Sequence, residues 1–199
     1  MGGIESGQEI EIKLKLASAG EGRAKLMAAG FLEWQPRDLE QNSLFDDGEG
    51  RLKARGELVR VRHYGGKVVL TYKRKGGERV GTLAGSLHKF RPELETEVAD
   101  AEPLIAVLRA VGLTPVLRYE KYRTVFRREA EEGLAMLDET PIGVYLELEG
   151  EPDWIDRLAG EMGFPVEEYV TASYLTLYDQ YCLSKGRKSA DMVFEETGV

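Results

Sequence analysis

The stretch Glu9-Ile10-Glu11-Ile12-Lys13 alternates charged and apolar side chains along the first segment expected to form a strand. Side chains two residues apart project from the same face of a strand, so Glu9, Glu11 and Lys13 point one way and the two isoleucines the other. Carboxylate oxygens are preferred ligands of hard cations, and an ammonium group beside them can hold a phosphate. The spacing therefore predicts a divalent-cation site next to a phosphate anchor.

Five further segments repeat this alternation, and each presents charges of a single sign on one face. The same-face sets are Arg60 and Arg62; Thr71, Lys73 and Lys75; Glu93, Glu95 and Glu97; Lys121 and Arg123; and Tyr145, Glu147 and Glu149. Like charges two residues apart repel each other unless a counter-charge or a ligand offsets them. A polyanion bound together with divalent cations would offset both the basic and the acidic sets.

For any one of these strands, the ordinary explanation is an antiparallel sheet with a solvated, charged face. Solvated faces usually mix their charges and contain Thr, Ser and Gln, whereas these segments separate the two signs by strand. The set as a whole favours a closed barrel with a charged interior and an apolar exterior covered by helices.

The elements that must position these residues follow from periodicity and turn signals. We expect strands over 8–16, 38–46, 57–63, 67–75, 87–98, 115–128, 133–139 and 142–150, and helices over 20–30, 101–111, 152–163 and 170–184. Hairpin turns are predicted at Asp46-Asp47-Gly48 and at Gly65-Gly66. A single α+β domain is expected over 8–185, with a flexible N-terminus over 1–7 and a frayed tail over 186–199.

Composition narrows the functional classes. The chain has 199 residues and a formal net charge of -8, which argues against a nucleic-acid binder. Cys182 is the only cysteine, and His63 and His88 are the only histidines, so a disulfide framework or a zinc centre is not expected. No apolar run approaches the length of a membrane helix, and no secretory segment follows the start, so the cytosol is the expected compartment.

Common catalytic motifs are absent from the sequence, including the P-loop, the serine elbow and the zinc-protease helix. Metal-assisted attack by water or by a substrate hydroxyl is then the most economical chemistry. Asp138 has two interpretations: it initiates the turn that follows it, or it adds a metal ligand near Glu147 and Glu149. Trp34 and Trp154 also have two, as base-stacking platforms or as core anchors.

The ordered set of motifs resembles the CYTH superfamily of triphosphate tunnel metalloenzymes, which includes class IV adenylyl cyclases, thiamine triphosphatases and inorganic triphosphatases. The matching elements, in order, are Glu9-Ile10-Glu11-Ile12-Lys13, Arg60-Val61-Arg62, Thr71-Tyr72-Lys73, Glu95-Thr96-Glu97, Lys121-Tyr122-Arg123 and Glu147-Leu148-Glu149. The resemblance covers most of the chain. It implies an eight-stranded antiparallel barrel with helices outside, dependence on Mg²⁺ or Mn²⁺, and a triphosphate-containing substrate such as tripolyphosphate or ATP.

Mapped onto this chain, the resemblance assigns roles to individual residues. The implied metal ligands are Glu9, Glu11, Asp138, Glu147 and Glu149, and the implied catalytic set is Glu9, Glu11, Lys13, Glu147 and Glu149. The implied triphosphate contacts are Lys13, Arg60, Arg62, Lys73, Lys121 and Arg123. Supporting roles fall to Glu95 and Glu97, which can hold a metal or orient the bases, to Lys75, and to Lys185, which can close over the substrate.

Hydrolysis of a triphosphate is the first expected activity, with conversion of ATP to cyclic AMP and pyrophosphate as the alternative. A non-catalytic polyphosphate or nucleotide sensor is a second class, and a plain structural β-protein is a third. Leu58 stands where the resembling animal thiamine triphosphatases carry an aromatic residue, which argues against thiamine recognition. The Ala172-Ser173-Tyr174 stretch is similar to small prokaryotic chains grouped with the cyclases. The expected partner is a small molecule, with no nucleic acid and no membrane, and the expected state is a monomer or homodimer.

Overall fold

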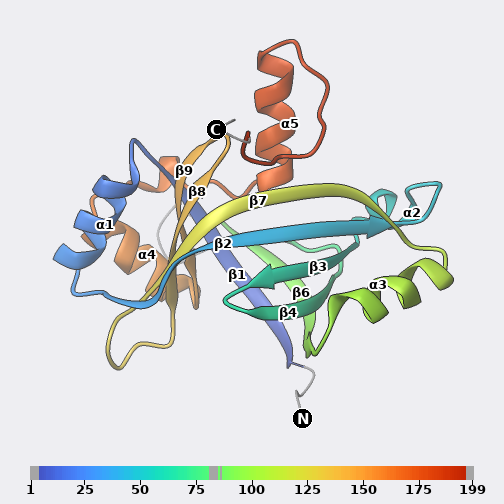
Figure 1. The fold of residues 1–199 in the computed structure, drawn as a ribbon. Helices are drawn as coiled ribbons and strands as arrows, with labels where there is room; N and C mark the ends of the chain where they lie inside the picture. Colours follow the sequence, from blue (N-terminus) through green and yellow to red (C-terminus); the bar gives the residue numbers. More distant parts are fainter. Residues whose placement is uncertain (1–4, 81–84, 86, 196–199) are drawn as a thin grey trace.

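A computed structural model describes residues 5–80, 85 and 87–195, and its central feature is a closed antiparallel barrel (Figure 1). Neighbouring strands follow the order β1-β9-β8-β7-β2-β3-β4-β6, and β6 pairs back onto β1. The strands of the ring are β1 (Glu5–Leu16), β2 (Leu32–Asp46), β3 (Leu58–Tyr64), β4 (Lys67–Lys73), β6 (Leu87–Val98), β7 (Thr114–Arg127), β8 (Leu134–Thr140) and β9 (Gly143–Glu149). The prediction of an eight-stranded antiparallel barrel is confirmed.

The first strand closes the ring because its two halves have different neighbours. The segment Glu5 to Glu11 pairs with β6, and the segment Glu11 to Leu16 pairs with β9. Ring closure leaves no free sheet edge along most of the barrel. The alternation along β1 also sets the two faces: Glu11 and Lys13 lie inside, whereas Ile12 and Leu14 belong to the apolar cluster under the helices.

Helices cover the apolar outside of the barrel. The helices are α1 (Ala19–Ala28), α2 (Arg51–Ala54), α3 (Ala101–Ala110), α4 (Pro152–Glu161) and α5 (Tyr174–Ser184), with a 3₁₀ turn at Val166–Glu168. Leu26 of α1 and Ile155 of α4 pack with strand residues in one core cluster, and Leu108 of α3 packs in another on β3. None of the helices in the described residues is both long and apolar enough to cross a membrane.

The last helix lies apart from α1 and α4, beside β7 and β9 (Figure 1). Its residue Tyr174 joins a buried cluster with Leu44, Tyr119 and Tyr145, which come from three barrel strands. Since the Tyr119 hydroxyl accepts a hydrogen bond from the interior Arg60 and the Tyr174 hydroxyl donates to the interior Asp138, this cluster borders the barrel interior. The start of the helix therefore lies against the interior.

Of the tail expected to fray over 186–199, residues 186–195 are described, and the part around Met192 is docked instead; residues 196–199, like residues 1–4 of the expected flexible N-terminus, lie outside the described residues. Met192 is 1% exposed, and its backbone bonds to Arg118 and Glu120 on the part of β7 that β8 does not reach. The Asp191 carboxylate also accepts from the backbone and side chain of Arg118. This short segment satisfies backbone groups at an edge of β7 that would otherwise be open.

Several local elements depart from the sequence-based prediction. The second strand begins at Leu32 rather than residue 38, and two register shifts near Gln35 explain why its alternation is hard to read. The expected turn at residues 46–48 is instead a connection through α2, whose backbone N–H groups bond to the Asp46 carboxylate. A short strand, β5 (Gly77–Val80), pairs with β6 and was not predicted. The predicted Gly65-Gly66 turn is confirmed.

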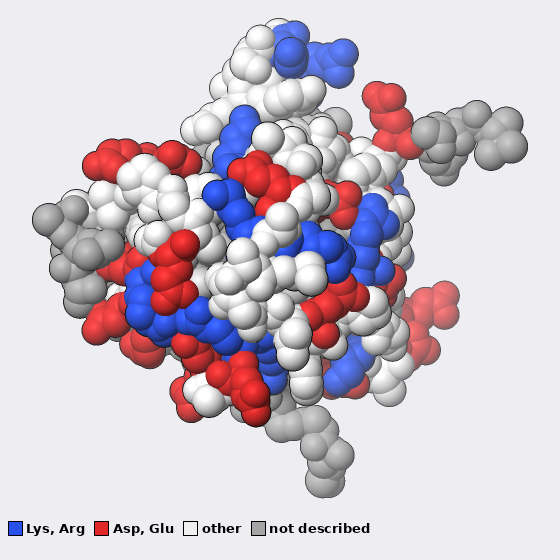
Figure 2. Space-filling view, turned by 90° about the vertical axis from the view of Figure 1, so that its left-hand side faces the viewer, with Lys and Arg blue, Asp and Glu red and all other residues white. Residues whose placement is uncertain are grey.

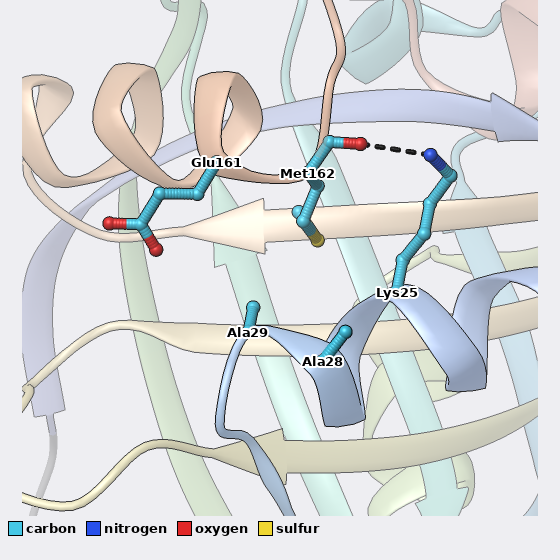
Figure 3. A pocket seen from close by; sticks show the side chains of 5 residues that line it. All are labelled: Lys25, Ala28, Ala29, Glu161 and Met162. Carbon is cyan, nitrogen blue, oxygen red and sulfur yellow. Dashed lines mark hydrogen bonds between the residues drawn. The ribbon is translucent and has the colours of Figure 1, made fainter.

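A hollow outside the barrel lies where the ends of α1 and α4 meet (Figure 3). Lys25 donates to the Met162 carbonyl at 2.8 Å, and its ammonium lies 4.7 Å from the centre of the Phe164 ring. Cationic side chains at a helix C-terminus commonly satisfy the last carbonyl groups in this way. This hollow is accounted for by the packing of two helix ends.

Candidate active site

The barrel interior gathers most of the residues that the sequence analysis singled out. Buried or partly buried in it are Glu9, Glu11, Lys13, Arg60, Arg62, Lys73, Glu95, Lys121, Arg123, Asp138, Glu147 and Glu149. Three residues with predicted supporting roles lie elsewhere: Glu97, Lys75 and Lys185 are exposed. Glu97 forms an ion pair with Lys67 at 2.8 Å on the surface.

On the acidic wall, formed by β1 and β9, lysines and glutamates alternate in space. The Lys13 ammonium, 2% exposed, lies 2.7 Å from Glu11 and 3.2 Å from Glu147. Lys89 of β6 also pairs with Glu11. Burial and the Glu147 carboxylate oppose ionisation of Glu11, but the two ammonium groups outweigh them and lower its pKa to about 2. Glu11 is therefore a carboxylate at neutral pH.

Glu149 shows the opposite balance. Burial and the carboxylates of Glu9, Glu147 and Glu11 raise its pKa to about 8. Glu149 forms no ion pair with any other residue that the structure describes. Negative charge on this wall thus exceeds what the nearby lysines offset, and the wall keeps a proton in the absence of another cation.

A second acidic group lies between β1, β4 and β6. The Lys73 ammonium is 2.6 Å from Glu9 and 3.0 Å from Glu93. Burial and the carboxylates of Glu9 and Glu95 together raise the pKa of Glu93 to about 7. Their effect outweighs that of the Lys73 ammonium, which lowers the pKa. The strand register brings Lys73 and Glu93 together, because the two residues are directly paired across the β4–β6 ladder.

The basic wall is organised around Asp138, which is 0% exposed. Its Oδ1 accepts from Arg123 Nε at 2.7 Å, and its Oδ2 accepts from Lys121 at 2.9 Å and from Arg123 Nη2 at 2.7 Å. The Tyr174 hydroxyl donates to Oδ2 at 2.7 Å. Asp138 thus holds two predicted phosphate contacts in place, and both of its oxygens already have protein partners.

The remaining interior arginines, Arg60 and Arg62, share Glu95 of β6 as a partner. Arg60 donates to the Tyr119 hydroxyl, to Thr71 and to Glu95, each at 3.2 Å. Arg62 donates to both oxygens of Glu95 at 3.4 Å. Glu95 therefore orients the two arginines, which is one of the roles that the resemblance implies for it.

Sequence reasoning missed several residues that face the interior. Glu40 is 0% exposed, 3.5 Å from Lys121 and 3.8 Å from Arg123, and these bases overcome its burial and lower its pKa. Asn42, which donates to Glu40 at 3.0 Å, is buried beside it. Polar Gln41 and Ser43 alternate with these two residues, so neither face of this strand reads as apolar.

Lys89 and Tyr174 were missed for other reasons. Lys89 continues the face of Glu93 and Glu95 two steps toward the start of the strand, so a longer alternation would have found it. Tyr174 comes from α5, and only the docking of that helix brings it inside. Trp154 is a core anchor, because a Cβ atom on Gly133 would lie 2.5 Å from its ring, and it donates to Glu131 at 2.6 Å.

The sequence of this chain matches one family model and a relative from an archaeon. Residues 7–162 match the family model described as the CYTH domain. A Methanocaldococcus jannaschii protein named "Putative adenylate cyclase" is 25% identical over 142 residues, which cover 71% of this chain and 75% of that protein.

Solved structures share the barrel fold. A Vibrio parahaemolyticus protein named a "putative adenylate cyclase" has a TM-score of 0.69 at 16% identity, with 85% of this chain and 96% of that chain covered. A Hippeastrum protein, described as a "putative adenylyl cyclase" with a dominant triphosphatase activity, has a TM-score of 0.59 at 21% identity, with 95% and 98% covered. Since the family model spans most of its length, this chain belongs to the CYTH family.

Proposed function

We propose that this protein is a divalent-metal-dependent enzyme that hydrolyses a triphosphate-containing substrate held inside the barrel. The observation that carries the proposal is the buried interior itself, where six predicted phosphate contacts and five predicted metal ligands lie together. Burying so many charges is costly, and replacing buried ion pairs by apolar groups is often neutral or stabilising. A charged interior that the fold does not require points to a charged ligand.

Phosphate binding is the work of the basic side chains. The guanidinium groups of Arg60, Arg62 and Arg123 can each contact two phosphate oxygens, and Lys13, Lys73 and Lys121 supply point charges. In the free protein their carboxylate partners occupy these donors. These carboxylates keep the bases aligned until the substrate arrives. A bound triphosphate would then compete with them for the donors.

A divalent cation fits the acidic wall by donor type and by charge. Among the described residues, no three acidic, His or Cys side chains are gathered closely enough to form a metal site as they stand. However, burial and the carboxylates of three neighbouring glutamates raise the pKa of Glu149, and this crowding of acidic groups supports a bound cation. Glu9, Glu11, Glu147 and Glu149 would hold Mg²⁺ or Mn²⁺, and Asp138 stays a further candidate ligand. The cation would offset charge that develops on the phosphate oxygens.

Two outcomes are chemically open in such a site. Attack of water on a terminal phosphorus gives hydrolysis, and attack of a ribose 3′-hydroxyl on the α-phosphorus of ATP gives cyclic AMP and pyrophosphate. Hydrolysis is favoured because Trp34 and Trp154, the residues considered for base stacking, lie outside the interior: Trp34 is 60% exposed and Trp154 is a core anchor. The activity described for the Hippeastrum protein also supports hydrolysis. The name of the M. jannaschii relative supports the cyclase as second candidate.

The surface supports a small-molecule substrate rather than a nucleic acid. On the face drawn in Figure 2, basic and acidic side chains lie next to one another. The described ion pairs likewise combine the two signs: Arg128 pairs with Glu131 and Glu161 at 2.7 Å each. We further propose a cytosolic protein that is a monomer or homodimer, with its functional domain over 8–185.

A product assay tests the proposal. Purified protein is given tripolyphosphate, ATP or thiamine triphosphate with Mg²⁺ or Mn²⁺, and the products are separated by ion chromatography. Orthophosphate from tripolyphosphate is the expected result. Cyclic AMP with pyrophosphate from ATP would establish the cyclase instead. Binding of tripolyphosphate without any product would indicate the sensor.

A further inference from the structure

We propose that Tyr174, the first residue of α5, is a positioning residue that fixes two phosphate-binding lysines from strands that are not neighbours in the barrel. The inference rests on the proposed function, because it concerns how the interior is prepared for a triphosphate. The strand motifs give α5 no part in the site. The proposal therefore adds a helix to a site that is otherwise built from strands.

Tyr174 touches the site with both its hydroxyl and its ring. The hydroxyl donates to Asp138 Oδ2 at 2.7 Å, the same oxygen that accepts from Lys121. The ring centre lies 5.0 Å from the Lys13 ammonium and 4.9 Å from the Lys121 ammonium. Both distances are within the range of cation–π attraction, which is stronger in a desolvated site. One side chain therefore contacts two ammonium groups and the carboxylate that holds one of them.

The contacts connect strands that are not neighbours. Lys13 lies on β1 and Lys121 on β7, and β9 and β8 separate these strands in the barrel. Without Tyr174, Lys13 is tied to Glu11 and Glu147, and Lys121 to Asp138 and Glu40. The tyrosine ring is a common contact for both, so it sets the distance between the two ammonium groups.

The position of Tyr174 is fixed from outside the barrel. Ser173 caps α5 by accepting from the Thr176 N–H group at 3.2 Å. Just before the cap, Val170 exchanges two backbone hydrogen bonds with Lys13, each 2.9 Å. The segment that leads into α5 is thus attached to the strand that carries one of the two lysines. The docking of α5 therefore places the Tyr174 ring against both lysines.

Three substitutions separate this role from simple packing. Tyr174→Leu removes both the ring and the hydroxyl, and Tyr174→Phe keeps the ring. Tyr145→Phe is the matched control. The Tyr145 ring packs edge-on against the Tyr174 ring, with 5.6 Å between the ring centres, but the Tyr145 hydroxyl bonds to no other described residue. Steady-state KM and kcat for tripolyphosphate with Mg²⁺ are measured for each variant, together with the melting temperature.

We expect Tyr174→Leu to raise KM on the order of tenfold, which corresponds to the loss of two cation–π contacts, with a smaller change in kcat. Tyr174→Phe should raise KM less, since it keeps those contacts and lets Asp138 hold Lys121 more tightly. Tyr145→Phe should leave KM unchanged. If Tyr174→Leu does not fold, a raised KM in Tyr174→Phe alone supports the proposal.

Two results overturn the proposal. One is an unchanged KM in the folded Tyr174 variants, and the other is an equal rise in Tyr145→Phe, which would indicate a general packing effect. A wild-type protein that neither binds nor cleaves tripolyphosphate would instead refute the proposed function, and this inference with it. Calorimetric titration of tripolyphosphate into the wild type distinguishes these two failures.

Discussion

Glu149 and Glu93 keep protons that ordinary glutamates would lose, since burial and neighbouring carboxylates raise their pKa values to about 8 and about 7. An acid with a raised pKa binds more protons in the folded than in the unfolded chain. Its contribution to stability is complete below the unfolded pKa and is lost as the pH rises through the folded pKa. In metal-free buffer, the free energy of unfolding should fall between about pH 5 and about pH 8, by at most about 1.4 kcal/mol per pH unit for each group.

Denaturant titrations at several pH values check this prediction. Glu149→Gln should flatten the dependence above about pH 7, because an amide does not titrate there. Glu97→Gln is the control, since Glu97 is an exposed acid paired with a surface lysine. A wild-type stability that rises steadily over this pH range would contradict the assignment.

Glu40 is an anion surrounded by bases, and its removal should be costly. It lies near Lys121 and Arg123, and its Oε2 atom has no hydrogen-bond partner among the described atoms. Glu40→Gln removes one of the buried carboxylates beside these bases and leaves Asp138 as their remaining shared counter-charge, so stability should fall by up to about 3–5 kcal/mol. Tripolyphosphate should restore more stability to this variant than to the wild type, because its negative charge replaces the missing carboxylate. Thermal melts with and without the ligand decide the matter; equal shifts in both proteins would refute it.

Arg62 tests the phosphate-binding role with little risk to folding, since Glu95 is its only ion-pair partner among the described residues and its side chain is 19% exposed. Arg62→Ala should raise KM for a triphosphate by on the order of tenfold or more, as expected for the loss of a charge-assisted contact. Lys67→Ala, which removes an exposed base one strand away, should leave KM unchanged. Equal KM values for the two variants would show that Arg62 does not contact the substrate.

The described segment after α5 supports β7 rather than fraying. Met192→Ala should lower the free energy of unfolding by about 2–5 kcal/mol, because the side chain is 1% exposed. Leu183→Ala, at a position 76% exposed, should change it by less than about 0.5 kcal/mol. Chemical denaturation measures both. A frayed segment would make the two substitutions equally mild.

The elements also show which features sequence could predict. Strict alternation predicted the barrel and the interior bases and acids. The apolar face of each strand must pack under the helices, so its charged face must line the interior. Glu40 escaped prediction because polar residues stand on both faces of its strand. Tyr174 and Met192 escaped because tertiary docking of α5 and the following segment decides their positions, and local periodicity carries no signal for that.

At the scale of the whole molecule, an acidic protein encloses a concentrated set of bases. The formal net charge is -8, yet the barrel interior holds arginines and lysines from five strands. A free polyphosphate is repelled by the molecule at long range, and a metal-bound polyphosphate carries less negative charge. In the proposed function, a bound metal would therefore serve both the encounter with the protein and the neutralisation of the acidic wall.

The central claim is that the barrel interior binds a triphosphate together with a divalent cation. Isothermal titration of tripolyphosphate into the protein with Mg²⁺, compared with the same titration of orthophosphate and with a metal-free titration, tests it most directly. We expect saturable binding of tripolyphosphate with Mg²⁺, much weaker binding of orthophosphate, and a melting temperature raised by preferential binding to the native state. Equal, weak binding of both anions, unaffected by Mg²⁺, would contradict the account.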